Sequence, residues 1–134
     1  MAIPFASEEW AQALSEALNA SAAYKDAAKK WEGDLCMVIP AGSGMAQDTY
    51  LYLDLWHGDC RNAYATNKAV EAEFLITAPY PTWKEVTLGK LDPIKGILSR
   101  KLKLNGPLAK ILKSPNAAVE LVNCAKSLDT AWPV

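Results

Sequence analysis

The segment from Trp83 to Gly106 constrains the fold more than any other part of the chain, because it holds start and stop signals for three short elements. Thr82 is followed three residues later by Glu85, which is the pattern of a capping box at a helix N-terminus. Gly89 stands where a glycine commonly ends a helix. These residues predict a short helix that begins at about Thr82 and ends at Gly89.

A second short helix and a strand follow within the same segment. Asp92 supplies an acceptor side chain at an N-cap position and Pro93 fits the first helical position, so we expect a helix through about Ser99. Polar and apolar residues then alternate over residues 101–105, which is typical of a strand with one solvated and one buried face. The glycine and proline that come next end this strand.

Hydrophobic periodicity assigns the rest of the chain. Ser7 predicts the N-cap of a first helix, in which Trp10, Leu14 and Leu18 recur every four residues as a core-facing stripe. The further elements predicted are helices at 22–31, 107–112 and 115–128, and strands at 35–39, 50–56, 61–66 and 71–77. Strands grouped in the middle of the chain with helices at both ends predict an α+β fold, in which helices cover one face of a five-stranded, mostly antiparallel sheet.

Length and composition indicate one soluble domain over residues 1–134. The residues are 51% hydrophobic and 22% charged, and no stretch approaches the ~18 consecutive apolar residues of a membrane span. The N-terminal residues lack the basic region and the apolar run of a secretory signal. Three cysteines, an odd number in unrelated contexts, favour reduced thiols over a disulfide framework. We therefore expect a cytoplasmic protein.

Charge is distributed unevenly along the chain, although the net charge is only −1. Residues 1–89 carry a net charge of −6, residues 90–113 carry +6, and residues 114–134 carry −1. One interpretation is a basic strand face and helix rims in contact with solvent. The other is a patch that transiently contacts anionic lipid headgroups, where each lysine or arginine adds about 1 kcal/mol. In the second interpretation, the residues expected to face the membrane are Lys95, Arg100 and Lys110.

His57 and Cys60 form the one cluster that suggests nucleophilic or metal chemistry. A zinc site needs four ligands with paired spacing, and no second pair of cysteines or histidines is present. A Cys-His enzyme also needs an orienting group and an oxyanion hole, for which the sequence gives no sign. The glycines at 42 and 44 lack the lysine of a phosphate cradle, and the acidic balance argues against nucleic acid. We expect no catalytic residue, metal or cofactor.

Large aliphatic residues are concentrated between Val86 and Leu112, where eleven occur within 27 residues. From periodicity alone, these residues fill a core. They would also suit the wall of a cavity for an acyl chain or a sterol, since each CH₂ group removed from water contributes about 0.8 kcal/mol. The composition of this segment is compatible with both interpretations.

The order of elements in this region resembles that of the sterol carrier protein type 2 family of lipid-binding domains. The likeness rests on a short helix, Gly-Lys-Leu-Asp-Pro at 89–93, a second short helix, and Lys-Leu-Lys-Leu-Asn-Gly at 101–106. Upstream, residues 50–58 resemble the family's strand that ends in a glycine turn, and residues 70–77 resemble the strand before its short helices. The likeness covers roughly residues 48–128.

This resemblance implies that short helices stand off the sheet and enclose an apolar tunnel. The implied function is the non-enzymatic binding, and by extension the intermembrane transfer, of a fatty acid, acyl-CoA, phospholipid or sterol-like molecule. The sequence departs from the family at Arg100, where many relatives have a glycine, a difference that affects the local turn and the mouth of the pocket. The tunnel wall expected from this resemblance consists of Leu53, Leu55, Phe74, Ile76, Trp83, Val86, Leu91, Ile94, Ile97, Leu98, Leu102, Leu104, Leu108 and Leu112.

Two other functions remain open at this point. The first alternative is a protein-interaction or accessory module of the same fold, in which the aliphatic residues fill the core. The second is a small hydrolase built on His57 and Cys60. A lipid that co-purifies with the protein would separate lipid binding from the interaction module.

Overall fold

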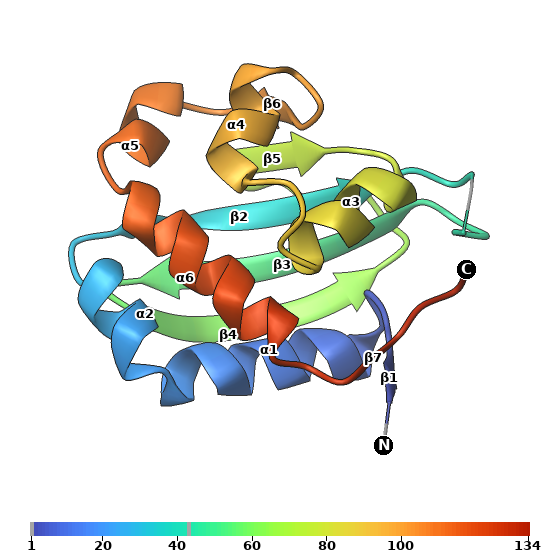
Figure 1. Cartoon of the computed structure of the whole chain (residues 1–134), viewed down its shortest axis with the longest axis horizontal. Coiled ribbons are helices and arrows are strands. Elements are labelled where there is room, and N and C mark those ends of the chain that lie inside the picture. Colours follow the sequence, from blue (N-terminus) through green and yellow to red (C-terminus); the bar gives the residue numbers. More distant parts are fainter. Residues whose placement is uncertain (1, 43) are drawn as a thin grey trace.

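A five-stranded sheet forms the centre of the computed structural model, which describes residues 2–42 and 44–134 (Figure 1). Its strands are β2 (Glu32–Ile39), β3 (Thr49–Trp56), β4 (Asp59–Thr66), β5 (Phe74–Thr77) and β6 (Lys103–Asn105). They lie side by side in the order β4, β3, β2, β5, β6. β2 and β5 pair in parallel, and the other neighbouring pairs are antiparallel. The predicted α+β fold with a five-stranded, mostly antiparallel sheet is therefore confirmed.

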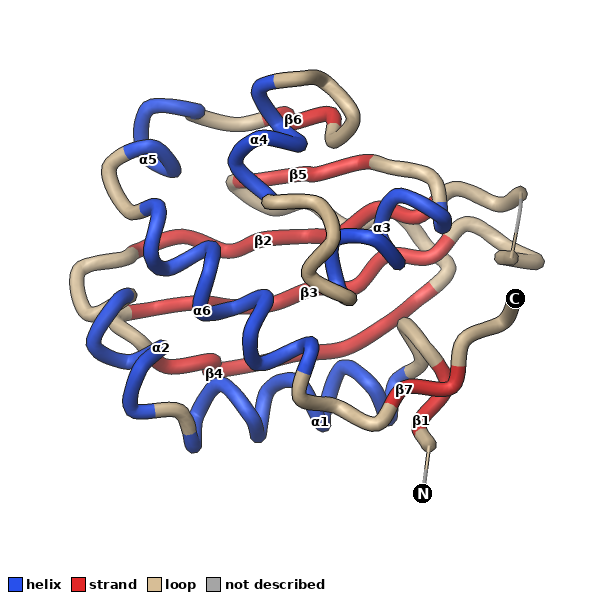
Figure 2. The backbone as a smooth tube through the Cα atoms, in the orientation of Figure 1, coloured by secondary structure: helices blue, strands red, loops and turns tan. Residues whose placement is uncertain are grey.

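Helices cover one face of this sheet (Figure 1, Figure 2). They are α1 (Glu8–Ala20), α2 (Ala22–Ala27), α3 (Tyr80–Thr87), α4 (Pro93–Leu98), α5 (Leu108–Leu112) and α6 (Pro115–Lys126). α1 packs along the edge strand β4, and α6 lies across the layer in contact with each of the other five helices. Two short strands, β1 (Ile3–Pro4) and β7 (Thr130–Ala131), pair in parallel and bring the two ends of the chain together. Within the described residues, no helix combines the length and the apolar character that crossing a membrane requires.

The hydrophobic core lies between the helices and the face of the sheet that they cover. Alternate residues of β3, Leu51, Leu53 and Leu55, turn into it and are at most 3% exposed. The stripe predicted for α1 is fully buried on the same side. The Ser7 hydroxyl accepts a hydrogen bond from the Trp10 N–H at 3.1 Å, so the predicted N-cap of α1 is confirmed.

The capping box predicted from Thr82 and Glu85 is wrong. α3 begins at Tyr80, with Pro79 as its N-cap and Pro81 in its first turn, and no side chain caps it. Thr82 already lies inside the helix, where its N–H donates to the carbonyl of Pro79 at 3.0 Å. Proline has a φ close to the helical value and needs no N–H partner in a first turn, so the prolines start the helix earlier than the threonine would.

The helix predicted over residues 22–31 is too long, and the strand predicted over 35–39 is too short. α2 ends at Ala27 and β2 begins at Glu32, which pairs with Trp56 across the β2–β3 hairpin. Backbone pairing therefore extends β2 through residues that carry no strand periodicity of their own. The two strands predicted at 35–39 and 50–56 are both present and pair as neighbours in this hairpin.

The last two strands are shorter than predicted. β5 starts at Phe74 and not at residue 71, because the Glu73 N–H donates to the Asp34 carboxylate at 2.7 Å and not to a neighbouring strand. β6 starts at residue 103 and not at 101. Arg100 adopts a left-handed backbone conformation with φ of +66°, and the turn that it makes delays the start of the strand.

Candidate functional site

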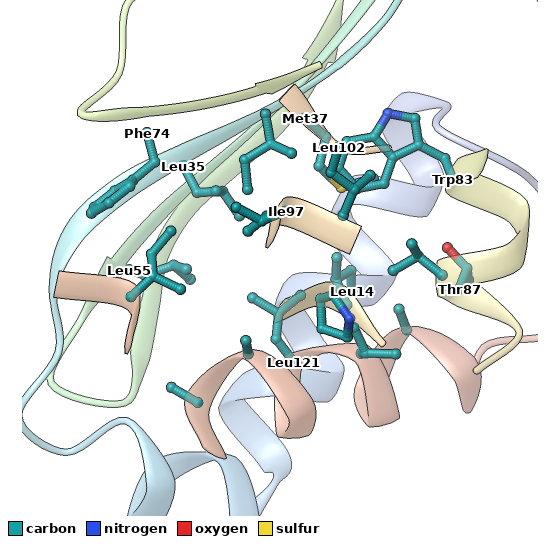
Figure 3. A pocket seen from close by; sticks show the side chains of 18 of the residues that line it. Leu14, Leu35, Met37, Leu55, Phe74, Trp83, Thr87, Ile97, Leu102 and Leu121 are labelled. Carbon is teal, nitrogen blue, oxygen red and sulfur yellow. The ribbon is translucent and has the colours of Figure 1, made fainter. Parts of the chain in front are cut away.

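An apolar cavity of about 110 Å³ lies between the sheet and the helices (Figure 3). One water molecule needs about 10–15 Å³ on the same scale, so the cavity has room for a chain of several atoms. Its lining follows α6 from Ser114 to Ala125, a length of about 16 Å at 1.5 Å per residue. The cavity is therefore elongated along α6.

Start and stop signals in the sequence place the short helices α3 and α4 against this cavity. Gly89 has a φ of +80° and ends α3 as predicted. The Asp92 side chain accepts hydrogen bonds from two backbone N–H groups of the next turn, at 2.8 and 3.0 Å, so the predicted N-cap of α4 is confirmed. Gly96 is buried in α4, and a Cβ at this position would lie 2.9 Å from Leu102 Cδ1. Glycine therefore allows α4 to approach the cavity wall closely.

The structure brings half of the predicted tunnel residues together around the cavity. Those that line it are Leu55, Phe74, Ile76, Trp83, Val86, Ile97 and Leu102. Those that lie outside the lining are Leu53, Leu91, Ile94, Leu98, Leu104, Leu108 and Leu112. Leu53 is fully buried in the core, whereas Leu98 and Leu112 are 58% and 45% exposed. α4 and α5 make fewer than two turns each, so their sequences do not define which face turns inward.

Two longer helices supply a part of the wall that the sequence analysis did not assign to it. The lining residues from α1 and α6 are Trp10, Leu14, Ala117, Ala118, Leu121, Val122 and Ala125. The signal was present in the apolar stripe of α6, which combines alanines with larger aliphatic residues. Alanine side chains are too short to fill the space between α6 and the sheet, and this leaves room for a cavity.

Side-chain exposure indicates that the cavity opens between α4, α5 and α6. Lining residues from this region, such as Ile97, Ser114 and Leu121, are partly exposed. At the α3 end, Trp83 and Val86 are only 5% and 4% exposed. The cavity therefore has an open end near α5 and a closed end near α3.

Three exposed apolar residues belong to the helices that border the open end. Leu98, Leu112 and Val119 are 58%, 45% and 37% exposed, and each belongs to a different helix. Each directly follows a residue that lines the cavity. We call these three residues the apolar rim. It gives the outer edge of the opening the same apolar character as the inside.

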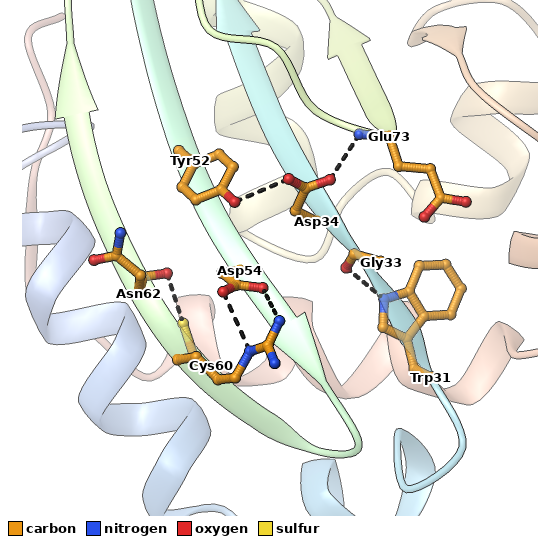
Figure 4. A network of polar contacts seen from close by, with 9 residues as sticks. Trp31, Gly33, Asp34, Tyr52, Asp54, Cys60, Asn62 and Glu73 are labelled. Atoms are coloured by element: carbon orange, nitrogen blue, oxygen red, sulfur yellow. Dashed lines mark hydrogen bonds and ion pairs between the residues drawn. The ribbon is translucent and has the colours of Figure 1, made fainter.

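The indole N–H groups near the cavity donate to protein atoms. Trp83 donates to the carbonyl of Val38 at 3.1 Å, and Trp10 donates to the hydroxyl of Thr130 at 3.0 Å. Trp31 donates to the carbonyl of Gly33 at 3.0 Å (Figure 4). These three tryptophans therefore contribute apolar ring surface to the lining.

Lys110, predicted to face a membrane, is held in an ion pair beside the cavity. Its Nζ lies 3.0 and 3.1 Å from the two carboxylate oxygens of Glu73, and 5.6 Å from the ring centroid of Trp31. The Asp34 carboxylate positions Glu73 by accepting its backbone N–H at 2.7 Å, and it also accepts the Tyr52 hydroxyl at 2.9 Å (Figure 4). This pair connects α5 to the start of β5.

His57 and Cys60 do not form a catalytic arrangement. Cys60 is 5% exposed, burial raises the pKa of its thiol, and the thiol donates to the carbonyl of Asn62 (Figure 4). A nucleophilic cysteine needs the opposite shift, because the thiolate is the reactive form. The His57 ring is half-exposed and its Nε2 lies 2.6 Å from the Glu32 carboxylate. Across residues 2–42 and 44–134, no group of three or more His, Cys, Asp or Glu side chains could hold a metal ion.

Comparisons with known proteins point to one family. The sequence matches the model of the SCP-2 sterol transfer family over residues 11–118. The structure is similar to a crystal structure of sterol carrier protein 2, with a TM-score of 0.88 and 39% sequence identity over 92% of this chain and 98% of that one. A search of the curated proteins finds no significant match.

Two further solved structures have the same architecture. The first is the solution structure of a conserved hypothetical protein of Thermus thermophilus, described as a candidate sterol carrier protein, with a TM-score of 0.86 and 39% identity over 93% of this chain and 90% of that one. The second is apo sterol carrier protein 2 from Yarrowia lipolytica, with a TM-score of 0.58 and 19% identity over 87% of this chain and 88% of that one. At that lower identity, the second shows the shared fold alone.

Proposed function

Because the chain belongs to the SCP-2 sterol transfer family, we propose that it binds one long-chain lipid in the cavity between α6 and the sheet, without catalysing a reaction. The observation that carries the proposal is the apolar lining, which runs about 16 Å along α6. Half of the ~30 Å hydrocarbon core of a bilayer is about 15 Å, so the lining has the length of one lipid tail. Each CH₂ group that enters the cavity contributes about 0.8 kcal/mol.

Filling the cavity from α6 tests this proposal. We expect Ala118→Trp to abolish displacement of a fluorescent fatty acid by unlabelled lipids, because the indole would occupy space between α6 and the sheet. The matched control is Asn123→Trp, in which the same side chain is introduced on the same helix at an exposed position outside both the lining and the apolar rim. Far-UV circular dichroism of both variants checks that the fold is retained.

Native mass spectrometry of the freshly purified protein provides the second measurement. We expect a complex with one lipid per chain, which solvent extraction then identifies by class. If neither a fatty acid, an acyl-CoA, a phospholipid nor a sterol binds, lipid binding is refuted and the protein-interaction module with the same fold becomes the better account. Equal loss of binding in Ala118→Trp and Asn123→Trp would place the lipid somewhere other than the cavity.

Transfer of the lipid to and from a membrane would use the open end of the cavity. The apolar rim lies there, and Lys95, Arg100 and Lys113 on the same segment are exposed. These cations would attract anionic headgroups while the rim enters the interface, so a tail could cross without meeting water. Lys110 is omitted from this group because it is paired with Glu73.

Transfer rates between vesicles test this second part of the proposal. We expect transfer to anionic vesicles to be faster than to neutral ones and to slow with added salt, since the Debye length is only about 8 Å at 0.15 M. Joint neutralisation of Lys95, Arg100 and Lys113 should remove the difference in transfer rate between the two kinds of vesicle. The control is joint neutralisation of three lysines that are exposed elsewhere, Lys29, Lys30 and Lys68, which should preserve this difference. Equal rates to both kinds of vesicle at low salt would show that the basic segment is only a solvated surface.

A further inference from the structure

Thr87 places one of a few hydroxyl groups in the mainly apolar wall of the cavity. It is the last residue of α3, it is 4% exposed, and its side chain belongs to the lining (Figure 3). Its Oγ1 makes no hydrogen bond to any described residue. Every fully enclosed side-chain nitrogen or oxygen atom of the described residues has a partner, so the unpaired Oγ1 keeps some accessible surface, on a residue that lines the cavity.

The position of this hydroxyl matters as much as its lack of a partner. Trp10 and Leu14, which line the same end of the cavity, are fully buried, and Val86 is 4% exposed. The end of α3 lies next to the end of α6, since a Cβ at Gly89 would be 3.4 Å from the Nζ of Lys126. Thr87 therefore lies at the closed end of the cavity, remote from the opening near α5.

We propose that the lipid carries a neutral oxygen, a hydroxyl or a carbonyl, on the part that enters deepest, and that Thr87 Oγ1 forms a hydrogen bond with it. This inference rests on the proposed function, since it assumes that a lipid occupies the cavity. A charged group is excluded at this depth, because one hydroxyl cannot replace the hydration shell of an ion. A plain hydrocarbon tail would leave the Thr87 hydroxyl without a partner, which disfavours such ligands relative to an oxygenated one.

Two other hydroxyl groups belong to the lining, and neither comes from α3. Ser114 is at the open end and partly exposed, so water can form a hydrogen bond with its hydroxyl there. Tyr24 is 1% exposed on α2, near the thiols of Cys60 and Cys124, and burial raises the pKa of its hydroxyl. Thr87 supplies the hydroxyl from α3 at the closed end, and Tyr24, on another helix, provides a comparison within the same cavity.

The test compares the dissociation constants of octadecanoic acid with those of its hydroxy and oxo derivatives, substituted at successive carbons from the middle of the chain to the methyl end. For the unmodified protein, we expect one substitution position to bind about 3- to 10-fold more tightly than the plain chain, the range of one net hydrogen bond. In Thr87→Val, which keeps the shape and removes the hydroxyl, this preference should vanish while the plain chain binds at least as well.

Matched variants test whether the binding preference comes from the Thr87 hydroxyl. Thr82→Val makes the same substitution on the same helix outside the lining and should keep the preference. Thr87→Val without ligand should be at least as stable in urea as the unmodified protein, since no hydrogen bond is lost. A preference that survives in Thr87→Val, or that disappears in Tyr24→Phe alone, would overturn the assignment. Binding of plain and oxygenated chains with equal affinity would refute this inference only, whereas no binding of any chain would refute the proposed function itself.

Discussion

Replacing Arg100 by glycine is expected to stabilise the protein, because the turn between α4 and β6 needs a left-handed residue. Arg100 has a φ of +66°, and its N–H donates to the carbonyl of Ile97 at 3.1 Å, which closes the turn. The left-handed conformation costs a residue with a Cβ about 1–2 kcal/mol, and glycine avoids this cost. Glycine loses more backbone entropy on folding, by about 0.5–1 kcal/mol. The difference between the two ranges is about 0–1.5 kcal/mol, and its centre gives a net gain in the free energy of unfolding of about 0.75 kcal/mol.

The side chain of Arg100 offers no compensation for this cost. It is exposed and forms neither an ion pair nor a hydrogen bond with the described residues, so its removal loses no polar interaction of the folded state. Urea unfolding of Arg100→Gly should show a higher midpoint with an unchanged slope, and the melting temperature should rise by roughly 2–4 °C.

Lys101→Gly is the control for this prediction. Lys101 is exposed and adjacent, but it does not have a positive φ, so glycine brings only the entropy cost there, about 0.5–1 kcal/mol of lost stability. If Arg100→Gly lowers the stability as much as Lys101→Gly does, then the left-handed conformation carries no strain and the reasoning is refuted.

Three further predictions concern the ion pair beside the cavity, the thiols and the turn before β4. A double-mutant cycle with Glu73→Gln and Lys110→Met should give a coupling energy of about 0.2–1 kcal/mol that falls with salt, because both side chains are about one third exposed; zero coupling at low salt would contradict the pair. Burial raises the pKa of the Cys36 thiol to about 11, so native protein should react slowly with thiol reagents at neutral pH. As the pH rises, the thiol of the unfolded protein loses its proton at a lower pH than the thiol of the folded protein. The free energy of unfolding should therefore fall above about pH 8.5, and an increase there would refute the raised pKa of Cys36. Gly58→Ala should lower the free energy of unfolding, measured in urea, by at least about 1–2 kcal/mol, because φ there is +85° and a Cβ would lie 2.9 Å from Lys25 Cα. An unchanged urea midpoint would contradict this prediction.

Local signals in the sequence predicted the fold well where one residue decides the backbone. Asp92 at an N-cap and Gly89 at a helix end both act within one turn, and the structure confirms both. The strands predicted at 35–39 and 50–56 follow each other in the chain, and they pair as β2 and β3. Boundaries failed where a partner far along the chain decides them, as at Glu73, whose N–H is bound by Asp34.

The lining of the cavity was predictable only in part, for a geometric reason. Strand residues such as Leu55 and Phe74 alternate strictly, so their inward direction follows from the sequence. α4 and α5 are too short for a periodic stripe, so Leu98 and Leu112 could not be distinguished from the inward residues before them. Charge patterning has the same limit, since nothing near Lys110 in the sequence points to Glu73 as its partner.

α4 connects the two parts of the proposed function because its few residues serve different surfaces. Ile97 lines the cavity, while Leu98, one residue on and rotated by about 100°, belongs to the apolar rim. Lys95 is exposed on the same helix, and Gly96 packs against Leu102 beneath it. α4 is rigid on the scale of one turn, so it cannot rotate to admit a lipid without also moving the rim and the charge next to it. Under the proposed function, contact of the rim with a membrane would therefore act on the opening of the cavity through this one helix of six residues.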